Sequence, residues 1–311
     1  MAILVVGSVA FDSIETPHGR VENCLGGAAT YFSLAASYFT PVRVIAVVGE
    51  DFSKENEAVM TSRGVDTAGL ERANGKSFHW TGSYLQNLNE AQTLKTELNV
   101  FETFSPKIPA AYQDSEYLFL ANIDPVLQEN VRSQMSGVRM VCGDTMNYWI
   151  TGHTEKLARV LKGLDALLIN DTEAKMLAKN DNLVGAASRI LQMGPKTLII
   201  KHGEYGATAF FSNRSFPSGT EVVTLPFRAP ALPLAEVVDP TGAGDSFAGG
   251  FFGYLASQPE QTPLVFKTAM FYGGVMGSFA VERFGTERLQ TLDRNEIDLR
   301  FKLFRGLSHL E

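Results

Sequence analysis

The chain has 311 residues, of which 45% are hydrophobic and 20% charged; this composition is typical of a soluble globular protein with one large α/β domain or two smaller ones. A net charge of −7 without any Lys/Arg-rich run argues against nucleic acid or an anionic membrane as the main partner, but not against small phosphorylated ligands. The apolar start MAILVVGSVAF lacks the features of a signal peptide, and no apolar run reaches transmembrane length, so we expect a cytoplasmic protein.

Short continuous apolar runs alternate with helix-length segments over the first two thirds of the chain. The candidate strands are 3–6, 44–48, 117–120, 138–142, 167–169 and 198–200. The candidate helices are 28–38, 52–63, 125–135, 154–162, 171–179 and 183–193. Continuous apolar runs are typical of strands covered on both faces. The alternation therefore predicts an α/β fold with a mostly parallel central sheet and helices on both of its faces.

Two polar segments with β propensity interrupt this rhythm, residues 11–24 and about 76–103. We predict that they form a small antiparallel β lid on the main domain, with a pair of surface hairpins as the alternative. Its aromatic residues Phe78, Trp80 and Tyr84 could cover a substrate ring. An exposed lid sheet could also pair with its copy, which would give a homodimer.

The last third of the chain changes character after residue 205. Short β-type runs at 206–211, 215–219 and 222–227 lead into a loop rich in proline, and three helices follow at about 244–257, 262–281 and 294–304. Because no long linker separates these parts, we expect residues 1–311 to form a single domain.

The stretch VVDPTGAGDSFAGGFF at 237–252 carries the most specific chemistry. Pro240 ends a strand, glycines allow a tight turn, and a helix then begins with its unpaired N–H groups and positive dipole end. Such a helix start binds anions, and Asp245 would stand beside the bound group. A phosphate next to a fixed carboxylate suggests phosphoryl transfer; the alternative is that Asp245 only favours the helix dipole.

Two common nucleotide motifs are missing from the sequence. There is no GxxxxGK[ST], so the chain is not a P-loop enzyme, and GSVAFD after the first strand offers only Gly7 in place of GxGxxG. A dinucleotide-dependent oxidoreductase is therefore poorly supported.

DPTGAGDSFAGGF resembles the C-terminal signature of the ribokinase-like carbohydrate kinases, also called the PfkB family. Other pieces follow in the order expected for that family: GSVAFD at 7–12, LGGAAT at 25–30, NDTE at 170–173 and KHGEYG at 201–206. The resemblance spans nearly the whole chain. It implies a ribokinase-like fold and an ATP-dependent kinase that phosphorylates a hydroxymethyl group of a small sugar, or of a nucleoside.

The resemblance also implies catalytic roles. Asp245 would be the general base that deprotonates the acceptor hydroxyl, and Gly242, Ala243 and Gly244 would form an anion hole with their backbone N–H groups.

Nucleotide roles follow in the same way. Asn170 and Glu173 would organise the phosphates and Mg²⁺, with Glu173 acting through water, while Lys201, Gly203 and Gly206 would border ATP. From the residues alone, Asn170 and Glu173 could equally cap a helix, and Lys201 could be a solvated charge.

Asp12, Gly26 and Gly27 would hold the hydroxyl groups of the acceptor. The family often has Asn where this chain has Tyr31, which could stack on a substrate ring or pack in the core.

Two further expectations concern the C-terminal part. Gly274 and Ser278 lie on a small-residue face of helix 262–281 that could admit an adenine ring or pack against a neighbouring helix. Some family members bind a monovalent cation such as K⁺, and the positions that match its site are Asp239, the carbonyl of Thr241 and the loop near Gly285.

The acceptor is less defined than the reaction. Sugar-acid kinases of the family carry an Arg near CGDTMNYW, and none stands there in this chain, which favours a neutral sugar narrowly over a nucleoside. A non-catalytic sugar- or nucleotide-binding regulator on the same fold is the alternative from another class, although such a protein would not need Asp245, Asn170 and Glu173.

Overall fold

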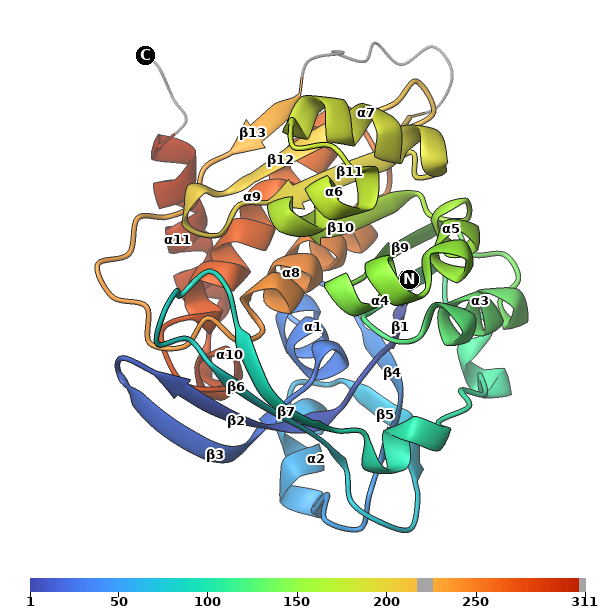
Figure 1. Ribbon diagram of the computed structural model, residues 1–311, viewed down its shortest axis with the longest axis vertical. Coiled ribbons are helices and arrows are strands. Elements are labelled where there is room, and N and C mark those ends of the chain that lie inside the picture. The colour runs from blue at the N-terminus through green and yellow to red at the C-terminus, as the bar shows by residue number, and fades with distance from the viewer. Residues whose placement is uncertain (217–225, 308–311) are drawn as a thin grey trace.

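The computed structural model describes residues 1–216 and 226–307, whose largest feature is a nine-stranded sheet (Figure 1). Its strand order is β13-β12-β11-β10-β9-β8-β1-β4-β5. The strands are β1 (Ile3–Val6), β4 (Val42–Val48), β5 (Asp66–Arg72), β8 (Tyr117–Leu120), β9 (Met140–Asp144), β10 (Ala166–Asn170), β11 (Thr197–Lys201), β12 (Ala207–Phe211) and β13 (Phe227–Ala229). The strands from β5 to β11 pair in parallel, and β12 and β13 are antiparallel. This confirms the expected mostly parallel sheet.

Alternate residues of the buried strands face two separate cores. In β1, Ile3 and Val5 belong to one hydrophobic cluster, while Leu4 and Val6 belong to the other. All four side chains are fully buried. The continuous apolar runs of the sequence thus reflect a sheet that is covered on both faces.

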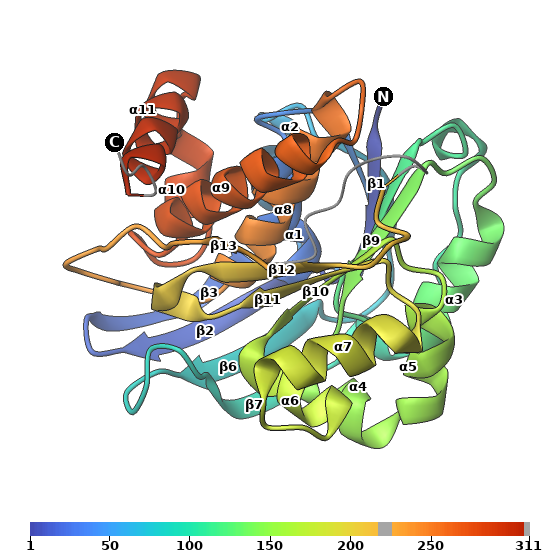
Figure 2. The same cartoon turned by 90° about the horizontal axis from the view of Figure 1, so that it is seen from above.

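Two layers of helices cover the sheet (Figure 2). One layer contains α1 (Ala28–Ala36), α2 (Lys54–Thr61), α8 (Ala243–Ser257) and α9 (Pro263–Ala280), with α10 (Glu287–Thr291) and α11 (Arg294–Gly306) outside them. The other contains α3 (Pro125–Gln134), α4 (Asn147–Gly152), α5 (Thr154–Leu161), α6 (Asp171–Ala178) and α7 (Leu183–Met193). No helix in the described residues is both long enough and apolar enough to cross a bilayer.

A second, four-stranded sheet stands apart from the first; we call it the small sheet. Its order is β3-β2-β6-β7, from β2 (Ala10–Thr16), β3 (Gly19–Gly26), β6 (Phe78–Ser83) and β7 (Gln92–Glu97). The two hairpins are antiparallel, but the central pair β2–β6 that joins them is parallel. Its strands β3 and β7 form the two edges. The predicted lid movement and the predicted dimer through these edges stay predictions.

Some elements have no counterpart among the expected ones. The edge strand β5 has a half-exposed sequence, DTAGLER, without a continuous apolar run, and α4 and α10 are only a turn or so long. The described residues also include three short 3-10 helices, η1 (Asn99–Thr103), η2 (Ala110–Tyr112) and η3 (Gly203–Tyr205). The strand expected at 222–227 falls largely outside the described residues, and the one expected at 215–219 falls partly outside them.

Candidate active site

The predicted nucleotide residues meet at the carboxyl edge of the parallel sheet. Asn170 ends β10 and Lys201 ends β11, and the two residues are direct partners in the strand register. Asp144 ends the next strand, β9, and Asp245 lies in the first turn of α8. This edge is where open α/β sheets bind their ligands, because neighbouring strand ends and the following loops enclose a crevice there.

Lys201 is the ammonium group that compensates three acids in this crevice. Burial raises the pKa of the Asp245 carboxyl, and Lys201 lowers it. Burial and the charge of Asp245 hold the pKa of Asp144 well above its usual range, again opposed by Lys201. The pKa of Glu173 is raised by burial and lowered by Lys201. Lys201 is therefore part of a buried charge cluster and not a solvated strand-end charge.

Asn170 and Glu173 form a complete capping box at the start of α6. The Glu173 N–H donates to Asn170 Oδ1 at 2.7 Å, and the Asn170 N–H donates to Glu173 Oε2 at 2.8 Å. The capping alternative is thus present in the structure. Because the box uses only Oε2 of Glu173, the second carboxylate oxygen is still available to a ligand.

Asp144 was missed by the sequence reasoning, which inspected CGDTMNYW only for an arginine. The side chain is buried, and its Oδ1 has no hydrogen-bond partner among the described residues. The next residue, Thr145, is also buried with an unpartnered Oγ1. The available signal was an acid directly after a buried strand, which places a carboxylate at the ligand-binding edge of a parallel sheet. An orphaned buried carboxylate oxygen indicates that a ligand normally satisfies it.

The turn before α8 has the conformation that its glycines suggested. Gly242 is left-handed, with φ 71°, and precedes the first helical residue. The Ala243 N–H donates to the Pro240 carbonyl at 3.2 Å, so one of the three amides predicted for the anion hole already closes the turn. Gly244 follows inside the helix, with Lys201 Nζ 2.8 Å from the position that a Cβ would take. We call residues 239–242 the phosphate turn.

Asp239 secures this turn from within the core. Its side chain is 0% exposed; Oδ1 accepts the Thr241 N–H at 2.9 Å and Oδ2 accepts the Gly285 N–H at 2.8 Å. Burial raises its pKa, and these bonds lower it. Asp239 therefore has a structural role that joins two loops, and the monovalent cation expected beside it stays a prediction.

The acceptor residues lie on the other side of the phosphate turn. Burial and the charge of Asp239 raise the pKa of Asp12 to about 8, while the Gly27 amide lowers it. A Cβ at Gly26 would stand 1.9 Å from Asp12 Oδ2, and Gly27 has φ 94°. The diglycine thus makes room for the carboxyl group of Asp12 and turns the chain into α1.

Tyr31 is part of the core and lies beside the phosphate turn. Its side chain is 1% exposed, and its hydroxyl has no partner among the described residues. Burial raises its pKa first, and the charges of Asp12 and Asp239 raise it further. The ring packs on Gly242, so the core alternative holds for the ring, whereas stacking of the ring on a substrate stays a prediction.

Gly203 and Gly206 shape the loop between β11 and β12. Both have positive φ, and the His202 N–H donates to the Gly206 carbonyl at 2.8 Å. A Cβ at Gly206 would stand 2.1 Å from the Ala229 carbonyl oxygen. This close turn explains the two glycines, and their contact with a nucleotide stays a prediction.

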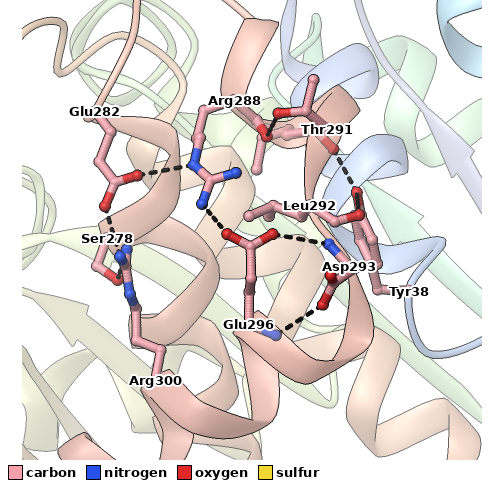
Figure 3. Close-up of polar contacts among 10 residues, drawn as sticks. Tyr38, Ser278, Glu282, Arg288, Thr291, Leu292, Asp293, Glu296 and Arg300 are labelled. Atoms are coloured by element: carbon pink, nitrogen blue, oxygen red, sulfur yellow. Dashed lines mark hydrogen bonds and ion pairs between the residues drawn. The ribbon is translucent and has the colours of Figure 1, made fainter.

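Gly274 and Ser278 lie on the side of α9 that contacts α11. A Cβ at Gly274 would meet the Phe304 ring at 2.8 Å, and Ser278 Oγ accepts from Arg300 Nη1 at 3.3 Å. Arg300 Nη2 also donates to Glu282, within the polar network between α9, α10 and α11 (Figure 3). These contacts favour the packing alternative, and an adenine contact at the two positions stays a prediction.

Asp245 connects the two halves of the site. Its charge raises the pKa of Asp12 on the acceptor side and of Asp144 and Glu173 on the nucleotide side. The carboxylate at the start of α8 therefore interacts electrostatically with residues of both predicted substrate sites. This is the arrangement that transfer of a phosphoryl group between two ligands requires.

Comparisons with known proteins agree with this geometry. A family model described as pfkB family carbohydrate kinase matches residues 2–292. The chain is 27% identical over 265 residues to the cytidine kinase of Thermococcus kodakarensis, an alignment that covers 83% of this chain and 90% of the relative.

Solved structures share the fold over nearly the whole chain. The nucleoside kinase of Burkholderia thailandensis in complex with ADP-inosine has a TM-score of 0.76 and 21% identity, covering 98% of this chain and 96% of that chain. The fructokinase of Vibrio cholerae bound to fructose, ADP and calcium ion has a TM-score of 0.76 and 14% identity, covering 96% and 98%. The fold therefore does not distinguish a nucleoside from a sugar as acceptor.

The family model, the ribokinase-like fold and the acidic site at the start of α8 lead to one assignment and confirm the resemblance seen in the sequence. The chain belongs to the pfkB family of carbohydrate kinases, and it is a kinase that phosphorylates a sugar or a nucleoside.

Proposed function

We propose that this kinase transfers the γ-phosphoryl group of ATP to a hydroxymethyl group of a nucleoside. The sequence alone placed a neutral sugar narrowly ahead of a nucleoside. Two curated relatives change that order: one is named a cytidine kinase, and an adenosine kinase of Schizophyllum commune is 24% identical over 275 residues. A free sugar stays the alternative acceptor.

The observation that carries the proposal is the position of Asp245. It lies in the first turn of α8, beside the phosphate turn, and its charge reaches Asp12 as well as the acids of the nucleotide side. In the proposed step the acceptor oxygen bonds to the γ-phosphorus, the bond to the β,γ-bridging oxygen breaks, and ADP leaves. The hydroxyl proton goes to Asp245.

Two groups of the chain prepare Asp245 for this task. Burial raises its pKa, which makes the carboxylate a better proton acceptor than an exposed one. The charge of Lys201 lowers the same pKa and so favours the ionised form of Asp245, the form that can accept a proton. The helix start supplies N–H groups for the charge that develops on the transferred phosphoryl group.

The acids on the nucleotide side fit Mg²⁺ bound together with phosphates. Asp144 has an orphaned buried oxygen, and the capping box leaves one oxygen of Glu173 unused. In the described parts of the chain, no three His, Cys, Asp or Glu side chains are grouped to hold a metal by themselves. That suits Mg²⁺, which keeps several waters and binds through one or two carboxylates and substrate phosphates. Its charge would neutralise the phosphates during transfer.

An ATP-consumption screen tests the proposal. The full chain is incubated with ATP and Mg²⁺ and with cytidine, adenosine, inosine, ribose or fructose, and the phosphorylated position is located by phosphorus NMR. We expect turnover with at least one nucleoside and phosphate on its hydroxymethyl group. The Asp245→Asn variant serves as the background control.

Three outcomes contradict the proposal at different levels. Turnover with a free sugar only would overturn the nucleoside assignment. Phosphate on a ring hydroxyl would overturn the position of attack. Nucleotide binding without any phosphorylated product would favour the non-catalytic regulator.

A further inference from the structure

Tyr84 is the aromatic residue of the small sheet that reaches the site. Phe78 stacks on Phe101 with ring centroids 5.4 Å apart, and Trp80 packs on Gly82 within its own sheet. Tyr84 comes directly after β6 and is 8% exposed, whereas the next residue, Leu85, is 55% exposed. The segment that links β6 to β7 is largely exposed, so the residues that bury Tyr84 belong to other parts of the chain.

The contacts of Tyr84 join the small sheet to the phosphate turn. Its N–H donates to the Glu15 carbonyl at 2.8 Å, so its backbone is held on β2, the strand that also carries Asp12. Its hydroxyl accepts a hydrogen bond from Thr241 Oγ1 at 3.3 Å. Thr241 is in turn held by Asp239 through its N–H.

The surroundings of the hydroxyl belong to both halves of the site. Three carboxyl groups, those of Asp239, Asp12 and Asp245, act on the phenol. Together with burial they raise its pKa well above the usual range, so it keeps its proton at working pH.

The same connection continues to the predicted nucleotide loop. Figure 2 shows the link between β6 and β7 beside the turn between β11 and β12. Asn89 Nδ2 donates to Glu204 Oε1 at 3.3 Å, and a Cβ at Gly203 would stand 2.2 Å from Asn89 Oδ1. The end of β6 and the connection to β7 therefore contact both the phosphate turn, through Tyr84, and the loop between β11 and β12, through Asn89.

We propose that Tyr84 is a positioning residue through which the small sheet holds the phosphate turn in place, by way of Thr241. Placement of the small sheet then orders the acceptor side and the transfer turn together. The inference rests on the proposed kinase function, and it adds a residue that the motifs do not contain.

Removal of the two hydroxyls tests whether the hydrogen bond between Tyr84 and Thr241 positions the phosphate turn. Tyr84→Phe and Thr241→Val each remove one partner with little change in shape. We expect each to lower kcat about tenfold, the scale of one lost hydrogen bond, with an unchanged KM for ATP. The double variant should be no slower than the slower single variant, because both act through one contact.

Tyr38→Phe is the matched control. Tyr38 also donates a tyrosine hydroxyl, to the Leu289 carbonyl at 2.6 Å, but it follows the C-terminal end of α1, whereas the diglycine precedes the N-terminal end. Its removal should leave kcat and KM as in the wild type. Equal kinetics for Tyr84→Phe and Tyr38→Phe, or fully additive losses in the double variant, would overturn the role of Tyr84.

Hydrogen exchange gives a readout that does not depend on turnover. Loss of the Tyr84 hydroxyl should speed exchange in residues 239–245 as well as 78–84, while Tyr38→Phe should change neither segment. Unchanged exchange at 239–245 in Tyr84→Phe would refute the positioning role of Tyr84. A wild-type chain that is inactive on every acceptor would refute the kinase proposal instead. The exchange result would still show whether Tyr84 holds the phosphate turn in place.

Discussion

Gly242 lies against the face of the Tyr31 ring: a Cβ at residue 242 would stand 2.3 Å from the Cγ atom of that tyrosine. The left-handed turn of Gly242 and the aromatic residue of α1 thus fit each other, although they are 211 positions apart. The contact explains how this chain accommodates tyrosine where the family often has asparagine. It also makes the phosphate turn sensitive to any side chain at residue 242.

Gly242→Ala should therefore damage the protein more than Gly244→Ala. The first combines a strained left-handed alanine, about 1–2 kcal/mol, with a clash against Tyr31. The second meets only the mobile end of Lys201, although a larger change, Gly244→Val, should still crowd the anion site. Urea unfolding and kcat measure both effects. Equal losses in the two alanine variants would contradict the packing described.

Asp245→Asn should lower kcat by roughly 100-fold or more and leave ATP binding nearly intact, because only the proton acceptor is lost. Calorimetric ATP titration and steady-state kinetics separate the two effects. Asp181→Asn, at an exposed aspartate before α7, is the control and should behave as the wild type. A wild-type rate in Asp245→Asn would mean that another group takes the proton.

Lys201→Met should move the acid limb of the pH–rate profile to higher pH. Lys201 lowers the pKa of Asp245, so its removal raises that pKa, and the base becomes ionised only at a higher pH. The profile of kcat/KM measures the shift. The exposed Lys162 offers the control Lys162→Met, and an acid limb that stays in place in Lys201→Met would exclude the charge coupling.

Asp144→Asn should raise the Mg²⁺ concentration needed for half-maximal activity. The variant keeps the size of the side chain but removes the charge of the orphaned carboxylate. Activity is titrated with Mg²⁺ at saturating ATP and acceptor, with Asp181→Asn as the control. If the Mg²⁺ dependence is unaltered, Asp144 is a structural acid and not a partner of the metal–nucleotide complex.

Asp12 should make the folded state less stable as pH rises. Its pKa is about 8 in the fold, against 3.8 ordinarily, so between those values the folded chain holds a proton that the unfolded chain has released. Stability from this group is complete below about pH 4 and is lost as pH rises through about 8.

Asp12→Asn cannot take up that proton. The free energy of unfolding of the variant should therefore increase relative to that of the wild type as pH rises from 5 to 8. Urea unfolding at both values measures the gain, and Asp181→Asn should show none. A constant difference between Asp12→Asn and wild type would mean that Asp12 titrates normally in the fold.

Much of the fold followed from local patterns. The continuous apolar runs predicted the buried parallel strands, and the helix at 183–193 has the bounds that its periodicity indicated. The edge strand β5 escaped notice because an edge strand of a covered sheet does not need an apolar run. The parallel pairing of β2 with β6 was also missed, since pairing between distant segments leaves no mark within either one.

The site was predictable where chemistry sits inside a motif. Asp245, Glu173 and Lys201, which the resemblance singled out, interact electrostatically at one edge of the sheet, and their roles in catalysis stay predictions. Asp144 was assigned no role, and Tyr84 only that of a lid aromatic that could cover a substrate ring. Both stand outside the motifs, and their importance comes from their neighbours: the buried acids for Asp144 and Thr241 for Tyr84.

The order of apolar runs and glycines, which acts over a few residues through backbone sterics and burial, was sufficient to determine the α/β class, the turn before α8 and the presence of a phosphoryl-transfer motif. Only the tertiary structure decided that Tyr31 packs on Gly242, that the charge of Lys201 acts on buried acids and that Tyr84, at the end of β6, contacts the phosphate turn. The reason is physical: pKa values, packing and desolvation depend on which distant residues the fold brings within a few ångströms, and that distance is not written in any local pattern.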